Sequence, residues 1–220
     1  MHELINQLKS KQLIWQGSHS QASTECLSTG FRSLDDRIGG GFPTSGVIEI
    51  KTTHGIGELR LLWPHIKRHS SGRSIVLIQP PGKLCAESLY SDGINLANVL
   101  LVYPKCAKDA LWAAEQCLKS GACSHVLLWQ DKLDVHHAKR LQVASEQRNC
   151  LHFLFKAKNH YTFSLPVSLS MTLLPHLNGL EVAITKRRGG WPQSRFIIPM
   201  NTFTMPLRSP TLSTHLRKLG

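Results

Sequence analysis

The chain has 220 residues, of which 26 are lysine or arginine and 14 are aspartate or glutamate, so its formal net charge is +12. This excess of positive charge favours a polyanionic partner over an acidic substrate or a membrane-spanning role. The simpler alternative is that the charge serves only to keep the protein soluble. No apolar run approaches the roughly 20 residues of a membrane-spanning helix, and the N-terminus lacks a signal-peptide pattern, which predicts a cytoplasmic protein. The six cysteines form no C-x-x-C pair and the twelve histidines are scattered, so we expect reduced thiols and no metal site.

The chain begins with a predicted N-terminal helix at residues 1–16, whose apolar face consists of Leu4, Ile5 and Leu8. A helix this short is marginal alone, so it must dock on its own domain or on another subunit. Residues 17–25 are rich in glycine, serine and glutamine, which predicts a linker.

The main domain is predicted at residues 26–200. Ser33 is the expected N-cap of a short helix that runs to Ile38 and ends at the three glycines 39–41. The apolar run at residues 47–50 then predicts a buried strand.

A turn and a helix follow this strand, an arrangement that binds phosphate in many α/β proteins because unpaired N–H groups at the helix start face an anion. The phosphate loop requires the pattern G-x-x-x-x-G-K-[ST]. Here Thr52 stands at the first glycine, Gly55 and Gly57 lie in the turn, Glu58 replaces the lysine and Leu59 replaces the hydroxyl residue. We therefore expect a degenerate phosphate loop, no bound cofactor and no ATP hydrolysis.

Further strands and helices alternate along the chain. The apolar and amphipathic patterns predict strands at 74–79, within 95–103, at 126–131 and at 151–155, and helices at 58–69, 85–89, 107–120 and 133–148. This alternation predicts an α/β fold with a mainly parallel sheet and helices on both faces. Pro64 should kink the first of these helices or cut it short.

The residues between 28 and 50 resemble the start of a RecA-type core: Ser-Thr-Gly, Leu-Asp, Gly-Gly-Gly-x-Pro and a strand Val-Ile-Glu-Ile occur in the same order and at the same spacing. The resemblance implies a catalytic glutamate after the strand that ends near Gln79, where no acid is present. It also implies a magnesium-binding aspartate after Trp129, but Asp131 is one position late. We expect Asp131 to be the N-cap of the following helix.

The last part of the domain is predicted to be antiparallel. Residues 168–174 and 180–185 form a hairpin with an Asn178-Gly179 turn, and residues 195–198 add an edge strand. The basic turn, residues 186–192, lies between this hairpin and the edge strand. Residues 201–220 are predicted to be a flexible basic tail.

The basic turn holds Lys186, Arg187, Arg188 and Trp191. In RecA-like proteins the corresponding turn reaches a bound phosphate, and the loop matching residues 156–165 contacts DNA. We therefore expect these four residues to bind single-stranded DNA or an acidic partner, and a solvated run of charges is the alternative.

Three stretches resemble particular members of the RecA-like superfamily more closely. Residues 55–62, 109–123 and 186–192 resemble ImuA, the RecA-like accessory protein of bacterial translesion synthesis, and residues 45–165 also resemble SulA, the SOS inhibitor of cell division. The ImuA resemblance implies a non-catalytic role in damage-induced mutagenesis, with ImuB and an error-prone polymerase as partners. RecA and a second copy of the chain are further candidate partners.

Two alternatives stay open. A SulA-type division inhibitor would bind FtsZ through apolar helical surfaces and would not need the basic turn. An active RecA-like ATPase would need a lysine from elsewhere, for example from a neighbouring subunit.

Overall fold

The computed structural model describes residues 25–157 and 164–200. Its helices are α2 (Arg32–Ile38), α3 (Glu58–His69), α4 (Ala86–Ser91), η1 (Leu96–Asn98), α5 (Ala107–Ser120) and α6 (Val135–Gln147). Its strands are β1 (Cys26–Leu27), β2 (Phe42–Pro43), β3 (Gly46–Thr52), β4 (Ser74–Ile78), β5 (Val99–Val102), β6 (Cys123–Trp129), β7 (Leu151–Ala157), β8 (Leu169–His176), β9 (Gly179–Arg187) and β10 (Gln193–Pro199).

The main sheet has eight strands in the order β10-β9-β8-β3-β7-β6-β4-β5. The pairs from β8 through β3, β7, β6 and β4 to β5 are parallel, whereas β8–β9 and β9–β10 are antiparallel. Strands β1 and β2 form a separate two-stranded sheet. The α/β fold class, the mainly parallel sheet and the C-terminal hairpin with its edge strand are therefore confirmed.

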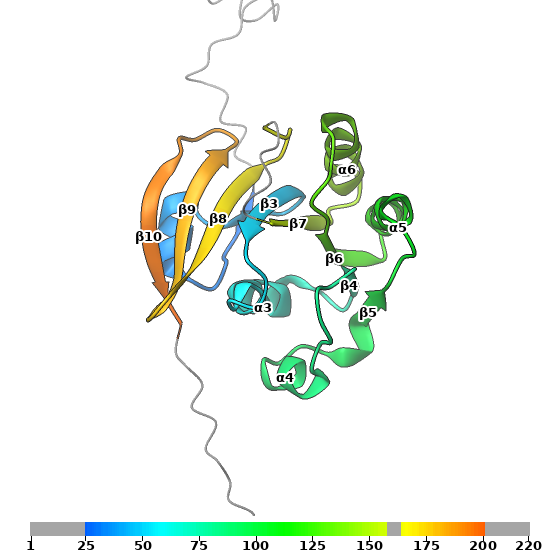
Figure 1. Ribbon diagram of the computed structural model, residues 1–220, viewed down its shortest axis with the longest axis horizontal. Helices are drawn as coiled ribbons and strands as arrows, with labels where there is room; N and C mark the ends of the chain where they lie inside the picture. The colour runs from blue at the N-terminus through cyan, green and yellow to red at the C-terminus, as the bar shows by residue number, and fades with distance from the viewer. Residues whose placement is uncertain (1–24, 158–163, 201–220) are drawn as a thin grey trace, which may run out of the picture.

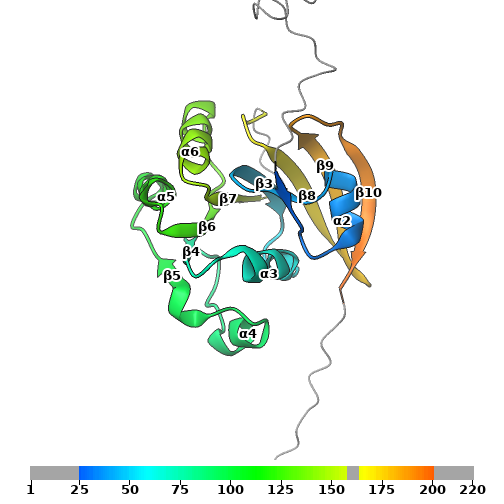
Figure 2. The same cartoon turned by 180° about the vertical axis from the view of Figure 1, so that it is seen from behind.

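Helices cover both faces of the sheet (Figures 1 and 2). Helices α2, α3 and α4 contribute to one apolar core, which includes Ile48, Ile50 and Phe153 from the sheet. Helices α5 and α6 contribute to a second core on the other face, which includes Val47 and Leu154. Neighbouring residues of one strand thus enter different cores, because side chains along a strand alternate between faces.

Helix α3 is not cut short at Pro64, which lies inside it. A proline in a helix interior costs about 3 kcal/mol. Leu61, Leu62 and Ile66 are fully buried on the same helix, and each buried side chain of this kind contributes roughly 1.5–3 kcal/mol. The helix continues past Pro64 because burial of its apolar face outweighs the cost of the proline. The expectation that Pro64 cuts the helix short is therefore wrong.

The start of α2 differs from the prediction. Phe31 is the N-cap and makes no side-chain capping bond, while Ser33 lies inside the helix. The polar contact near this end is instead made by Asp35, whose Oδ1 accepts hydrogen bonds from the backbone N–H of Thr29 at 2.8 Å and from its hydroxyl at 2.6 Å. The preceding segment is thus fixed by a side chain from within the helix.

The hairpin between β8 and β9 also differs in detail. Its turn consists of Leu177 and Asn178, and Gly179 is already paired with His176 as the first residue of β9. A side chain at Gly179 would place its Cβ 2.1 Å from the carbonyl oxygen of Ile198. Glycine is required here by the close approach of β10 rather than by the expected Asn-Gly turn.

Several predicted segments fall outside the described residues. They are the N-terminal helix with Leu4, Ile5 and Leu8, all but one residue of the linker, and the basic tail at 201–220. Within the described ranges, no helix is long and apolar enough to cross a membrane.

Candidate functional site

The degenerate phosphate loop lies between β3 and α3. Gly55 and Gly57 both have positive φ, at 81° and 97°, and Gly57 is the N-cap of α3. The carboxylate of Glu58, the first residue of the helix, turns back over this loop. Its oxygens accept hydrogen bonds from the backbone N–H of Gly55 at 3.2 Å and of Ile56 at 3.1 Å.

Glu58 therefore supplies the anion that such a loop would otherwise take from a ligand. Its side chain is buried, with the whole residue 4% exposed. A negative charge at a helix N-terminus is stabilised by the helix dipole and by the unpaired N–H groups. A triphosphate placed here would meet a carboxylate at the donors that normally hold it.

The other loop positions are also occupied by structural contacts. Thr52 is fully buried and its hydroxyl donates to the carbonyl oxygen of Thr53 at 3.0 Å. Leu59, at the position of the magnesium-binding hydroxyl, is partly buried against the core. The structure thus brings together the predicted loop residues and gives each a local partner.

Asp131 is not the N-cap of α6, which corrects the prediction. The N-cap is Asp134, whose carboxylate accepts the backbone N–H of His137 at 2.7 Å. Asp131 instead accepts the backbone N–H of Ala157 at 2.7 Å. Its carboxylate ties the loop after β6 to the end of β7, because these neighbouring parallel strands end side by side.

The basic turn does not present its cations as one patch. Arg187 donates from Nη1 to the carbonyl oxygen of Arg37 in α2 at 3.3 Å. Arg188 forms an ion pair of 3.0 Å with Glu146 in α6, on the opposite face of the sheet. Arg187 is the last residue of β9 and Arg188 is the first residue of the turn that follows, and the contacts of the two side chains lie on opposite faces of the sheet.

Lys186 and Trp191 complete the predicted set. The ammonium group of Lys186 donates to the carbonyl oxygen of Leu165 and lies 3.5 Å from the hydroxyl of Ser164. Trp191 is 84% exposed. Arg188 and Trp191 are therefore the members of the set most accessible to a partner.

Lys156, the first residue of the stretch 156–165 that the RecA resemblance matches to a DNA-contacting loop, belongs to β7 and is buried. Its ammonium group lies 3.6 Å from Oε1 of Glu49, and Lys51 lies 3.6 Å from Oε2 of the same carboxylate. The hydroxyl of Ser170 donates to Glu49 at 2.6 Å. Burial lowers the pKa of Lys156, and the nearby Glu49 carboxylate opposes that shift.

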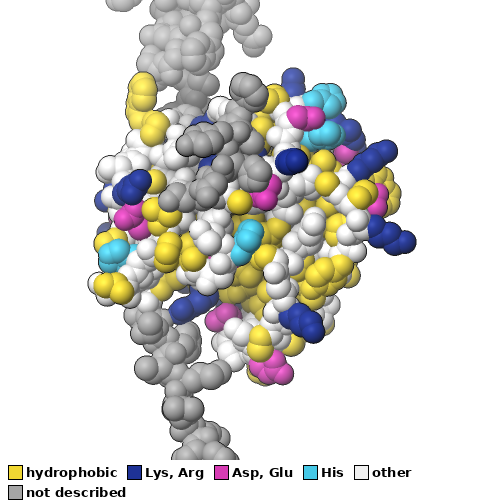
Figure 3. All heavy atoms as spheres, viewed as in Figure 1, with side chains coloured by type: hydrophobic (Ala, Val, Ile, Leu, Met, Phe, Trp, Pro, Cys, Tyr) yellow, Lys and Arg dark blue, Asp and Glu magenta, His cyan; other side chains and the backbone are white. Residues whose placement is uncertain are grey.

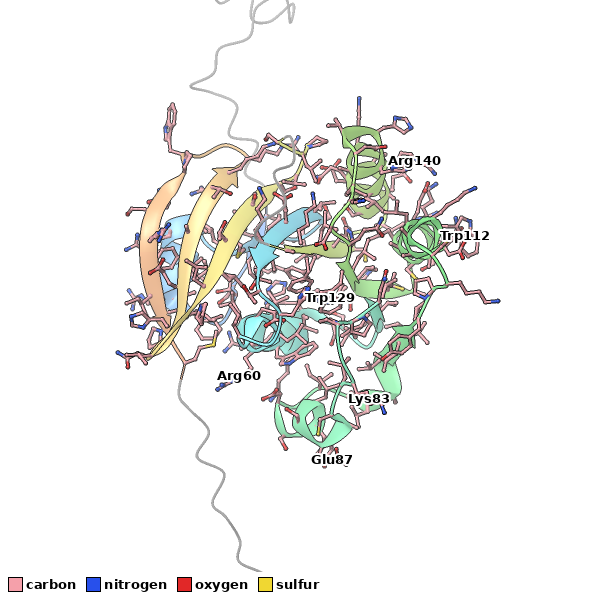
Figure 4. The ribbon with its side chains drawn as sticks, viewed as in Figure 1. Arg60, Lys83, Glu87, Trp112, Trp129 and Arg140 are labelled. Carbon is pink, nitrogen blue, oxygen red and sulfur yellow. The ribbon has the colours of Figure 1, made fainter. Side chains whose placement is uncertain are left out.

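An exposed apolar surface, which the sequence did not indicate, lies around β5. This strand is at the edge of the sheet, and the large side chains near it are 40% to 74% exposed: Tyr90, Leu100, Leu101, Tyr103 and Trp112. Trp112 points outward from α5 (Figure 4), and hydrophobic side chains gather over this part of the face in Figure 3. We call these residues the β5 surface.

The β5 surface escapes sequence reasoning because the run Val-Leu-Leu-Val has the same composition as a central strand. The signal that could have found it is a pair of large aromatic residues with lysines nearby in the sequence: Tyr103 is two positions from Lys105, and Trp112 is four positions from Lys108. Exposed apolar patches of this kind commonly mark protein contacts.

Several histidines are buried and held neutral. Burial lowers the pKa of His65 to about 4, although its ring contact with the carbonyl oxygen of Ser28 opposes the shift. Burial likewise lowers the pKa of His152 to about 4. No cluster of three or more histidine, cysteine, aspartate or glutamate side chains suited to a metal ion occurs in the part of the chain that the structure describes.

Comparisons with known proteins give a distant relationship. No family model matches the chain. The chain is 29% identical over 113 residues to the protein RecA of Phytoplasma mali (strain AT), covering 50% of this chain and 33% of that RecA. It is 26% identical over 113 residues to the protein RecA of Prochlorococcus marinus (strain AS9601), covering 51% of this chain and 31% of that RecA.

The chain thus spans about a third of the length of the curated relatives that it matches. Among solved structures, that of SulA from Pseudomonas aeruginosa matches with 26% sequence identity and a TM-score of 0.42, covering 50% of this chain and 97% of that chain. The chain is therefore distantly similar to RecA over half of its length.

Proposed function

We propose that this protein is a non-catalytic, RecA-like accessory protein of damage-induced, error-prone translesion DNA synthesis. In this role it binds DNA, mutasome partners or both, with ImuB and an error-prone polymerase as the protein partners. The resemblance of residues 55–62, 109–123 and 186–192 to ImuA supports the assignment to translesion synthesis.

The observation that carries the non-catalytic part is the position of Glu58. Its carboxylate accepts the N–H groups of Gly55 and Ile56, so the loop is held closed by the chain itself. A RecA-type ATPase needs these donors for phosphate and a lysine at this position. Glu58 thus stands at the position of the lysine, and its carboxylate also occupies the phosphate site.

The β5 surface supports a protein partner. An edge strand presents unpaired backbone N–H and C=O groups, and a strand from another protein can add to it by main-chain hydrogen bonds. Leu100 and Leu101 would then be covered by apolar side chains of the added strand. We infer that the partner contributes an extended apolar segment.

ATP turnover tests the non-catalytic assignment. Purified protein with magnesium ions and single-stranded DNA should hydrolyse ATP no faster than buffer alone. Hydrolysis that is lost when Gly57 is replaced by valine would show that the loop is active and would refute the assignment.

A pull-down tests the partner. Full-length protein recovered from damaged cells should bring down ImuB and the polymerase, and Leu100→Ser with Leu101→Ser should reduce that recovery at least tenfold. Leu177→Ser is the matched control, because Leu177 is 96% exposed on the hairpin turn at a distance from β5.

The second candidate function is a division inhibitor of the SulA type that binds FtsZ. It is favoured by the apolar character of the β5 surface together with the intramolecular contacts of Lys186 and Arg187. Recovery of FtsZ instead of ImuB in the same pull-down would support this function and contradict the first.

A further inference from the structure

A groove with a volume of about 440 Å³ lies between α5 and α6, on the face of the sheet that these two helices cover. Its lining includes Glu115 and Lys119 from α5, and Lys139, Arg140 and Val143 from α6. Lys139 and Val143 are exposed, so the groove opens to solvent. Figure 3 shows lysine, arginine and histidine side chains gathered over these two helices.

One carboxylate holds two cations of the groove in place. Oε1 of Glu115 accepts a hydrogen bond of 2.6 Å from the ammonium group of Lys119, and Oε2 accepts one from Nη2 of Arg140. The hydrogen bond from Lys119 keeps the pKa of Glu115 below its ordinary value, so this carboxylate is ionised at neutral pH. Cations from two different helices are therefore positioned next to each other by one anion.

Both cations keep hydrogen-bond donors for a ligand. The side chains of Lys119 and Arg140 are 48% and 50% exposed, whereas that of Glu115 is 11% exposed. An ammonium group carries three N–H donors and a guanidinium group carries five. The hydrogen bonds to Glu115 use one donor of each group, so the half-exposed cations can donate to an anion from solvent.

The charge of the groove favours an anionic ligand. Among the described residues that line it, Glu115 is the acidic one, and it faces Lys119, Lys139 and Arg140. One carboxylate cannot neutralise three cations, so the groove keeps a net positive charge. A bound anion would relieve the repulsion between these cations.

An exposed aromatic ring lies on the same face of α5. Trp112 precedes Glu115 by three residues and Lys119 by seven, and side chains at these spacings share one face of a helix. Trp112 is 64% exposed and points outward from α5 (Figure 4), so it borders the groove as well as the β5 surface. A positively charged groove beside an exposed aromatic ring is typical of single-strand binding, because cations contact phosphates while the ring stacks on a base.

We propose that the groove between α5 and α6 binds single-stranded DNA, with Lys139 and Arg140 on backbone phosphates and Trp112 stacked on a base. The aromatic ring favours a nucleic acid over an acidic protein segment, which offers carboxylates but no bases. The inference rests on the DNA-binding part of the proposed function and assigns that binding to residues outside the basic turn.

The salt dependence of binding tests the phosphate contacts. The full chain is titrated into a fluorescein-labelled oligothymidylate at a series of salt concentrations, and binding is followed by fluorescence anisotropy. Lys139→Gln with Arg140→Gln should reduce the log–log salt slope by about 1.4, because each phosphate contact on a single strand contributes about 0.7. Glutamine is a good helix former, and circular dichroism checks that the variant is folded.

A second double variant is the matched control. Arg60→Gln with Lys83→Gln removes the same charge from exposed positions, one in α3 and one before α4, which lie away from the groove (Figure 4). This variant should keep the native slope. It separates a contact in the groove from a general effect of net charge.

The aromatic contact has its own readout. Trp112→Leu should weaken oligothymidylate binding at least fivefold at constant salt and leave the slope unchanged, because stacking releases no counterions. Tyr90→Leu is the control for this variant, since Tyr90 is 74% exposed on α4 and should not contribute.

Four results would overturn the proposal. A native slope in the groove variant would place the DNA elsewhere, and only this inference would fail. An equal loss of slope in both double variants would show an effect of net charge alone. Native binding by Trp112→Leu, together with displacement of oligothymidylate by oligoglutamate, would assign the groove to an acidic protein segment. If the native protein binds no oligothymidylate, the DNA-binding part of the proposed function fails as well, whereas the ImuB pull-down still tests its protein partner.

Discussion

Replacing Glu58 by alanine should open the phosphate loop and make it bind an anion. The carboxylate accepts N–H groups from Gly55 and Ile56 and is almost completely buried. Without it, these donors face an unfilled turn at the start of α3. We expect the variant to be less stable than the native protein and to regain part of that stability in inorganic phosphate.

The size of the effect follows from the geometry. A hydrogen bond to a charged group contributes about 1.5–3 kcal/mol, and the distances of 3.2 Å and 3.1 Å place these bonds at the weak end. Gly55 is exposed, so water replaces part of the loss. The free energy of unfolding should therefore fall by roughly 1–2 kcal/mol.

Urea unfolding with and without inorganic phosphate measures both effects. Phosphate at about ten times its dissociation constant stabilises a protein by about 1.4 kcal/mol, and this gain is expected for Glu58→Ala only. Glu87→Ala is the matched control, because Glu87 also lies in the first turn of a helix, α4, but is exposed (Figure 4). Native protein and control should show only the common effect of the salt.

The reasoning would be refuted by a Glu58→Ala variant that unfolds at the same urea concentration as the native protein and gains nothing from phosphate. That result would mean that the loop donors are hydrated equally well without the carboxylate. Circular dichroism of the variant, matching that of the native protein, ensures that the comparison concerns the same fold.

Three further predictions concern the surface, the core and the N-terminus. Arg188→Ala should reduce the log–log salt slope of single-stranded DNA binding by about 0.7, the value for one phosphate contact. Arg187→Ala should leave the slope unchanged, because that side chain lies on the other face and binds a carbonyl oxygen. The free energy of unfolding should fall between pH 7 and pH 4, because the unfolded chain protonates His65 and His152 near the ordinary histidine pKa of 6.5 while the folded protein does so only near 4. Deleting residues 1–16 should weaken association with ImuB or with a second copy while leaving the core folded.

Each of these has a result that would contradict it. Equal slopes for native protein and Arg188→Ala would exclude a phosphate contact. The stability conferred by the neutral histidines is fully present above about pH 6.5 and lost as the pH falls toward about 4, at up to about 1.4 kcal/mol per pH unit and histidine. A urea midpoint that is the same at pH 7 and pH 5 would contradict this loss of stability. Unchanged binding by the truncated chain would assign the N-terminal helix to intramolecular packing.

The sequence by itself determined the class of fold and the loss of the phosphate-loop residues. Apolar runs and helical spacing fix local structure and burial over a few residues, so the strands and helices from β3 to β7 could be predicted closely. Glu58 and Leu59 could be placed at the lysine and hydroxyl positions by counting from Gly57. That the carboxylate of Glu58 fills the loop depends on a side-chain orientation that no pattern encodes.

The tertiary structure alone decided which residues meet across the chain. The contact of Arg187 with Arg37 joins residues 150 positions apart, and that of Asp131 with Ala157 spans 26 positions. The first contact depends on the packing of α2 against the antiparallel end of the sheet, and the second on β6 and β7 being neighbours in the strand order, a choice that local periodicity leaves open. The same choice puts β5 at the edge and exposes Leu100, whose sequence context is that of a buried strand.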